Sequence, residues 1–199
     1  MKKITLYTML TICFILMVGC KRKDIVITDE DVKTNTILVK NDGTIQAATV
    51  EVFDKSYYNL TELNTFITEN INKYNQTNGE NAITLNSLEQ KDGDAVLILN
   101  FSNIDHYKTF NKVDANLLTA EEAKSSDLTL PDVFVNASDG SYISKDVALK
   151  NGKYKVLVLN ENTDVLVDGT IKYYSEGALI SKSKMQTAAE GETVIIYKP

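Results

Sequence analysis

Aspartate-glycine pairs recur along the chain between runs of residues that favour β-strands. The two clearest are Asp42-Gly43, between residues 37–40 and 44–53, and Asp92-Gly93, between residues 82–90 and 94–101. Such a pair between two β-favouring runs is a strong hairpin signal, because both residues tolerate the left-handed backbone of a tight turn. The sequence therefore predicts two β-hairpins before residue 102.

Two details of these runs predict how the strands are covered. Residues 95–99 are apolar at every position, which indicates a central strand with both faces buried. In the run 44–53 the apolar residues change parity between Ala47 and Val50. A β-bulge near Ala47-Ala48 would keep that strand apolar on one face.

A helical pattern separates the two hairpins. At 100° per residue, one face collects Leu60, Leu63, Ile67, Ile71 and Tyr74. Asn59 is a suitable N-cap, Asn78-Gly79 is a suitable stop, and Glu69 is predicted to form an ion pair with Lys73 one turn later. We expect a helix from about Leu60 to Tyr74 that packs on the predicted central strand.

Shorter elements complete the expected fold. Ser102 or Asn103 precedes a short helical pattern, and Thr119 to Glu122 form a capping-box sequence. Beyond residue 128, short β-favouring runs recur about every ten residues between turn pairs. The predicted fold class is α+β: a hairpin-helix-hairpin-helix unit in residues 35–118, followed by a β-rich half in residues 128–199. That half forms either a separate domain or an extension of the first sheet.

The order of elements up to Ser102 resembles the GerMN domains of spore-forming bacteria. In those domains a hairpin and a helix precede a strand with a phrase like Asp-Gly-Asp-Ala-Val (92–96) leading to Asn-Phe-Ser (100–102). The Gly-Pro pair that they often carry after the helix is absent here. The resemblance implies a fold for this part of the chain and no activity.

The first twenty residues have the composition of a secretory signal peptide. Lys2 and Lys3 precede an uncharged run, residues 4–19, that ends in Gly19 before Cys20. This run is shorter than the ~20 apolar residues that a membrane-spanning helix needs. We therefore expect residues 1–19 to be removed.

The end of this segment resembles the lipobox of bacterial lipoproteins, in Leu16 or Met17, Val18, Gly19 and Cys20. The resemblance implies that diacylglycerol is attached to Cys20 and that cleavage precedes it. Two acyl chains anchor a protein stably, and the basic residues Lys21, Arg22 and Lys23 add attraction to anionic lipid head groups. Membrane lipid is thus an expected partner, and the expected location is the extracytoplasmic face of the cell membrane.

Two alternatives concern the same region. An ordinary secreted protein would have Cys20 after the cleavage site by coincidence. The charged residues 20–34 are predicted to form an extended tether, although residues 25–27 are apolar enough to pair as an edge strand.

The composition of the predicted mature chain excludes several classes of site. Residues 1–19 hold two lysines and no acid, so the formal net charge changes from −6 to −8 without them. An acidic chain is unsuited to nucleic acid, which is therefore not an expected partner. Past Cys20 the chain has no cysteine, and its only histidine is His106. Disulfides, cysteine-ligated zinc and thiol nucleophiles are excluded there, and we predict no metal site and no cofactor.

Motifs that suggest catalysis have simpler interpretations. Ser181-Lys182-Ser183-Lys184 contains the Ser-x-x-Lys of penicillin-recognising enzymes, but the chain lacks their Ser-Asp-Asn and Lys-Thr-Gly motifs. His106 is interpreted as a structural histidine beside Ile104 and Tyr107. No spacing selects a pair of carboxylates for glycoside hydrolysis, so we predict no catalytic residue.

Two tyrosine pairs are the candidate binding surface: Tyr57-Tyr58 and Tyr173-Tyr174. Exposed aromatic side chains become buried when a partner binds over them. In a strand, one residue of each pair would face outward. We therefore expect a lipid-anchored, non-catalytic module that binds or scaffolds an envelope protein or glycan. Two alternatives are an envelope glycan or peptide hydrolase with a carboxylate pair, and a solute-binding lipoprotein with a cleft near residues 113–130.

Overall fold

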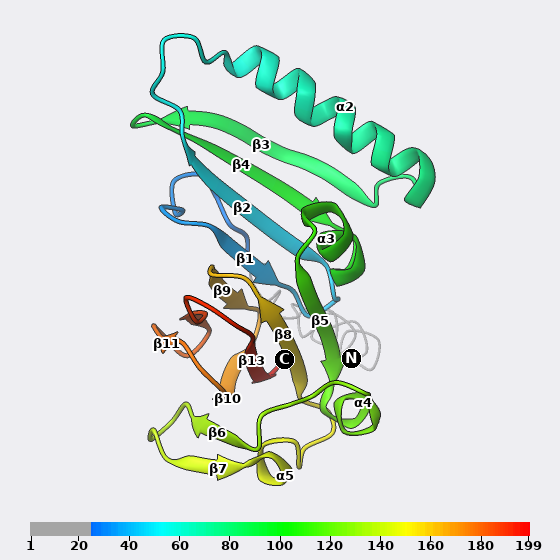
Figure 1. Cartoon of the computed structure of the whole chain (residues 1–199), viewed down its shortest axis with the longest axis vertical. Coiled ribbons are helices and arrows are strands. Elements are labelled where there is room, and N and C mark those ends of the chain that lie inside the picture. The colour runs from blue at the N-terminus through cyan, green and yellow to red at the C-terminus, as the bar shows by residue number, and fades with distance from the viewer. Residues whose placement is uncertain (1–24) are drawn as a thin grey trace, which may run out of the picture.

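The computed structural model describes residues 25–199, which form thirteen strands in two sheets and four helices (Figure 1). Up to residue 125 the elements are β1 (Thr36–Val39), β2 (Ile45–Val52), α2 (Leu60–Asn78), β3 (Ile83–Lys91), β4 (Asp94–Phe101), α3 (Ile104–Asn111), β5 (Asp114–Thr119) and α4 (Ala120–Ser125). After it come β6 (Val133–Asn136), β7 (Tyr142–Ser144), α5 (Lys145–Ala148), β8 (Lys155–Asn160), β9 (Asp164–Val167), β10 (Thr170–Tyr174), β11 (Ala178–Leu179), β12 (Lys184–Gln186) and β13 (Thr193–Lys198).

The strands are shared between the sheets without regard to chain order. The first sheet has the order β11-β12-β9-β1-β2-β4-β3, and the second has the order β5-β8-β13-β10-β6-β7. All neighbours are antiparallel except β1 and β9, which run parallel from Thr36 opposite Asp164 to Val39 opposite Val167. Strands from both sides of residue 128 therefore belong to the first sheet.

Along the central strands, successive side chains enter different cores. Leu157 and Leu159 of β8 join a core that lies between the sheets, whereas Val156 and Val158 join a second core under α4 and α5. In β1, Ile37 and Val39 enter the core between the sheets. A strand whose two faces are both covered has no solvated face, which explains the continuous apolar runs in these segments.

The N-terminal part of the described chain lies against the first sheet. Ile27 and Val32 are buried in a third core with Leu38 and Ile98. The backbone N–H of Ile27 donates to Oε1 of the buried Gln46 at 2.6 Å. Residues 20–34 were predicted to form a tether. The part of this segment that the structure describes, residues 25–34, is instead packed on the sheet.

Both predicted hairpins are confirmed. β1 pairs with β2 across Asp42-Gly43, and β3 pairs with β4 across Asp92-Gly93. Asp92 and Gly93 have φ angles of 53° and 92°, the conformation that the shortest hairpin loops require. Strand β4 has both faces buried, as its apolar run predicted, but it is second from the edge because β3 lies outside it.

The bulge predicted near Ala47-Ala48 is wrong. The pairing of β2 with β4 is regular from Ile45 to Val52, and Ala47 and Ala48 enter different cores. Because both faces of β2 are covered, neither face has to be polar. The register shift lies instead in β3 between Leu85 and Ser87.

The predicted helices are present, with longer bounds for the first. Asn59 caps α2 by accepting from the N–H groups of Thr61 and Glu62, and Asn103 caps α3. Thr119 and Glu122 form the expected capping box of α4. The pKa of Glu122 is lowered because the backbone N–H and then the hydroxyl of Thr119 donate to its carboxylate.

The predicted fold class, α+β with a hairpin-helix-hairpin-helix unit followed by a β-rich half, is wrong. Of the described residues 39% are in strands and 21% in helices, so the molecule is mostly β. Local patterns located individual elements but could not show the parallel pairing of β1 with β9, which joins segments about 130 residues apart. None of the described helices is both long and apolar enough to span a membrane.

Candidate binding surface

An aromatic cluster lies in the loop between β2 and α2. The rings of Phe53 and Tyr58 are stacked with centroids 4.8 Å apart, and Tyr57 meets Tyr58 edge-on at 5.0 Å. Tyr57 is 76% exposed and Tyr58 is 42% exposed. Aromatic pairs in these geometries attract each other, so the rings hold a fixed arrangement in spite of their exposure.

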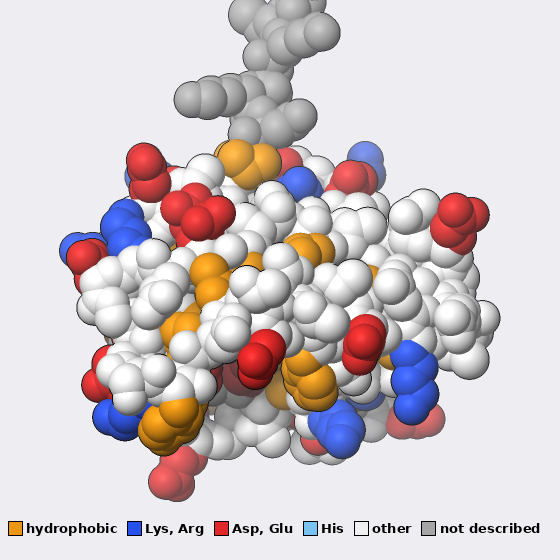
Figure 2. Space-filling model, turned by 90° about the horizontal axis from the view of Figure 1, so that it is seen from above, with side chains coloured by type: hydrophobic (Ala, Val, Ile, Leu, Met, Phe, Trp, Pro, Cys, Tyr) orange, Lys and Arg blue, Asp and Glu red, His pale blue; other side chains and the backbone are white. Residues whose placement is uncertain are grey.

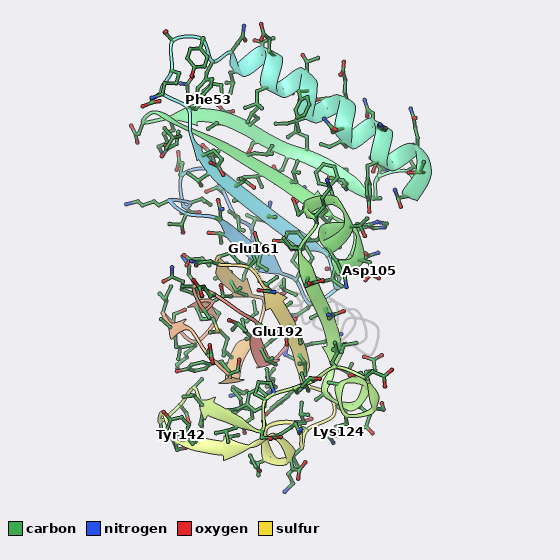
Figure 3. All side chains as sticks on the ribbon, viewed as in Figure 1. Phe53, Asp105, Lys124, Tyr142, Glu161 and Glu192 are labelled. Atoms are coloured by element: carbon green, nitrogen blue, oxygen red, sulfur yellow. The ribbon has the colours of Figure 1, made fainter. Side chains whose placement is uncertain are left out.

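Hydrogen bonds fix this loop to the turn between β3 and β4. The N–H of Phe53 donates to the carbonyl of Gly93 at 2.6 Å, and Nε2 of Gln90 donates to the carbonyl of Phe53 at 3.0 Å. Figure 3 shows Phe53 at the end of β2, close to the start of α2. The cluster is therefore held by two hairpins and a helix, which makes it a preformed surface.

A groove lies between α2 and β3, and the first of its lining residues, Leu60, comes two residues after Tyr58 in the chain. It has a volume of about 430 Å³ and is lined by Leu60, Thr61, Asn64, Thr65, Thr68, Glu69 and Leu88. Four of its seven lining residues carry a hydroxyl or an amide group, and Glu69 is its single charged residue. The end of the molecule that carries α2 shows acidic and basic side chains spread over the face, with several separate hydrophobic ones between them (Figure 2).

Strand β3 forms one edge of the first sheet beside this groove. At its start, the side-chain amide of Asn75 bonds to both backbone groups of Ile83: Nδ2 donates to the carbonyl at 2.8 Å, and the N–H donates to Oδ1 at 3.0 Å. Asn75 thereby takes the place of a neighbouring strand at that one residue. The predicted Glu69–Lys73 ion pair is not among those in the described part of the chain.

The second predicted tyrosine pair lies in a different environment. Tyr173 packs against the core under α4 and α5, and Tyr174 packs against the core between the sheets. Both are half-buried, because both faces of β10 are covered. The structure does not bring them near Tyr57-Tyr58, since β10 and the β2–α2 loop lie in different halves of the molecule (Figure 1). The membrane-anchoring residues, Cys20, Lys21, Arg22 and Lys23, lie outside the described residues.

Tyr173 does line a second groove, with Tyr154, Lys150, Lys153 and Glu121. This groove contains one carboxylate, and its other lining residues are Val147, Asn151 and Gly152. A cleft near residues 113–130 was the expectation for a solute-binding protein. Residues 114–119 instead form β5, which pairs along its whole length with β8.

Asp42 and Asp168 line one shallow groove with Ile25, Lys40 and Asn41. Two carboxylates in one groove are what the hydrolase alternative requires, one of them with a raised pKa to act as the acid. The pKa of Asp42 is lowered instead, chiefly because the hydroxyl and the N–H of Thr44 donate to it. Asp42 is therefore an ionised turn residue and is unsuited to the acid role.

His106 occupies a structural position. Its Nδ1 lies 3.1 Å from the hydroxyl of Tyr74, and the two rings meet edge-on, which joins α3 to α2. In the described part of the chain no group of three or more His, Cys, Asp or Glu side chains is placed to hold a metal ion.

Sequence reasoning found Tyr57 and Tyr58 but missed Phe53 and the groove. Phe53 is aromatic and stands directly before the Asp-Lys-Ser turn, which was an available signal. The groove had a weaker one, since the polar side of α2 carries Thr and Asn where a solvated helix usually carries charges. Its position beside a sheet edge depends on strand order, which the sequence does not show.

The chain matches no protein-family model, no curated protein and no solved structure.

Proposed function

We propose that this chain is a lipid-anchored module on the extracytoplasmic face of the cell membrane. In this proposal diacylglycerol on Cys20 holds the protein at the bilayer, with Lys21, Arg22 and Lys23 beside the lipid head groups. The folded part binds or scaffolds another component of the cell envelope and catalyses no reaction. The lipobox-like residues 16–20 support the anchor, and the aromatic cluster supports the binding role.

The observation that carries the binding role is the exposure of Tyr57 on a fixed support. A protein with this many buried aromatic and aliphatic residues has room to bury tyrosines, as Tyr107 and Tyr197 show at 2% and 1% exposure. Tyr57 and Tyr58 instead form an ordered cluster at the surface, and tyrosine is enriched among residues that dominate binding interfaces. The aromatic cluster is therefore the surface we assign to the partner.

Two pairs of variants test the proposal in the full chain expressed in a bacterium. For the anchor, Cys20→Ala is compared with Cys13→Ala, which removes the other cysteine of the chain. Intact-mass analysis should show a cleaved, glyceride-modified product for the parent chain and Cys13→Ala only. An unmodified product from the parent chain would refute lipid anchoring.

For the binding role, the double variant Tyr57→Ala/Tyr58→Ala is compared with Tyr142→Ala. Tyr142 is 79% exposed and lies at the other end of the molecule (Figure 3), so it controls for the loss of an exposed ring. Retention of purified envelope fragments on the immobilised protein should fall for the double variant only. Equal retention by all three proteins would remove the aromatic cluster from the proposal.

A further inference from the structure

We propose that the groove between α2 and β3 takes an extended polypeptide segment, which adds to the first sheet as a strand beside β3. The incoming segment carries aliphatic side chains at alternate positions and at least one lysine or arginine. This inference rests on the proposed function, because it names the class of partner that the binding module takes.

The free edge of β3 is the first observation. Both backbone groups of Ile83 point away from β4, since both bond to Asn75. Backbone groups alternate in direction along a strand, so those of Leu85 point the same way. At the other end of β3, the backbone groups of Lys91 and Asp94 bond to each other across a two-residue loop. Because the direction alternates along the strand, the backbone groups of Glu89 and Ser87 also point toward β4. Leu88 and Gln90 therefore present their N–H and C=O groups outward.

The register shift between Leu85 and Ser87 makes the directions derived from Ile83 agree with those derived from the turn. One extra residue resets the alternation, so Leu85 and Leu88 face the same way and both pack against the core between the sheets. The outward groups of Leu85, Leu88 and Gln90 then form one continuous row. An added strand bonds to such a row through its own backbone, whatever its side chains.

The length of this edge is the second observation. β3 has nine residues, whereas the other edge strands, β5, β7 and β11, have six, three and two. Proteins usually shorten, cover or charge their sheet edges, because a long free edge pairs with other chains. At Ile83 the edge is closed by Asn75, and beyond it the groove lies open between α2 and Leu88.

The chemistry of the groove selects the side chains of the segment. Leu60 and Leu88 offer apolar surface, and Glu69 is the only ionisable residue in the lining. Glu69 takes part in none of the ion pairs that the structure describes. A basic side chain on the incoming strand would complement it.

The test uses the full chain and a capped peptide of alternating valine and lysine, nine residues long to match β3. Its first control carries N-methyl groups at alternate residues, which remove backbone donors without changing the side chains. Its second control replaces lysine with glutamate. We expect the parent peptide to slow hydrogen exchange at Leu85, Leu88 and Gln90, and both controls to bind at least about tenfold more weakly.

The matched protein variants are Thr65→Trp and Thr77→Trp. Both threonines are exposed on α2, and each donates its hydroxyl to a backbone carbonyl, of Thr61 and Tyr74 respectively. Only Thr65 lines the groove. A tryptophan there should lower the affinity for the peptide by about tenfold or more, whereas Thr77→Trp should leave it unchanged.

Three results would overturn the inference. The first is equal binding of the N-methylated peptide, which would show that the backbone of β3 is not used. The second is unchanged affinity in Thr65→Trp, and the third is occupation of the groove by a chitin oligosaccharide in place of the peptide. In each case, continued retention of envelope fragments through Tyr57 and Tyr58 would leave the proposed function standing.

Discussion

The middle of the molecule and its α2–β3 edge are built in different ways. In β8 the four residues from Val156 to Leu159 are each at most 1% exposed, because both faces of the strand are covered. In α2, which is nineteen residues long, only Ile67 and Ile71 are buried. We therefore distinguish a middle that resists opening from a rim, α2 with β3, in which few apolar residues are fully buried. Regions with few buried apolar contacts open most easily, and binding segments are drawn from them.

We expect the largest change in the free energy of unfolding from a substitution in the middle of the molecule. Leu157→Ala removes a side chain that is fully buried between the sheets, so we expect the free energy of unfolding to fall by about 2–5 kcal/mol. Leu88→Ala, at the half-buried rim, should cost about 1 kcal/mol or less, because its site is open to the groove. Urea titration of both variants measures the difference. Equal losses would mean that the rim is packed as tightly as the middle.

The hydroxyl of a buried tyrosine on α3 should have the next largest effect. The hydroxyl of Tyr107 donates to Oε2 of Glu161, which joins α3 to the loop after β8. Tyr107→Phe leaves that carboxylate without its donor, and the expected loss in the free energy of unfolding is about 1–3 kcal/mol. Tyr142→Phe is the exposed control and should change nothing measurable.

The same residue predicts how stability depends on pH. Burial, and then the charge of Glu161, raises the pKa of Tyr107 above its ordinary value of about 10. The unfolded chain therefore releases its proton first, so stability is complete below pH ~10 and falls above it. The fall should be shallower in Tyr107→Phe but should not vanish, because burial also raises the pKa of Tyr197. A curve of unchanged slope would contradict this assignment.

The helix of the rim depends on its cap. Asn59 satisfies two backbone N–H groups at the start of α2, so Asn59→Ala should lower the free energy of unfolding by about 0.5–2 kcal/mol. Hydrogen exchange should accelerate in the first turn of α2 and stay unchanged in β13. Acceleration throughout the chain would mean that the rim and the middle open as one unit.

The smallest effect should come from the exposed ion pair beside the aromatic cluster. Lys55 and Asp54 lie 2.9 Å apart, with side chains 53% and 49% exposed. Such pairs contribute little, so Lys55→Ala should change the free energy of unfolding by less than about 0.5 kcal/mol. A larger loss in thermal or urea unfolding would show that the loop supports the fold as well as the surface.

Local signals in the sequence located most elements up to residue 125. Asp42-Gly43, Asp92-Gly93, Asn59 and the Thr119–Glu122 box each define their own geometry within a few residues. They failed where a distant segment decides the outcome. The pairing of β9 with β1 brings strands from both sides of residue 128 into one sheet, and the cover over both faces of β2 made a bulge at Ala47-Ala48 unnecessary.

The candidate site divides in the same way. Tyr57 and Tyr58 could be selected from sequence because they are adjacent tyrosines, whereas Tyr173 and Tyr174 show the same pattern and are half-buried against two cores. The sequence also placed Ile27 and Val32 in a tether, because residues 20–34 are rich in charge and almost free of core-forming periodicity. Which aromatic or aliphatic residue meets solvent depends on the layer above its strand, and that layer comes from elsewhere in the chain.

Native-state hydrogen exchange along β3 in the absence of any partner measures whether this edge is unpaired. We predict slow exchange at Ser87 and Glu89, which face β4, and fast exchange at Leu85, Leu88 and Gln90, which face outward. The amides of β8 and β13 should exchange only with global unfolding. Uniform protection along β3 would contradict the account, because it would show that the edge is already covered.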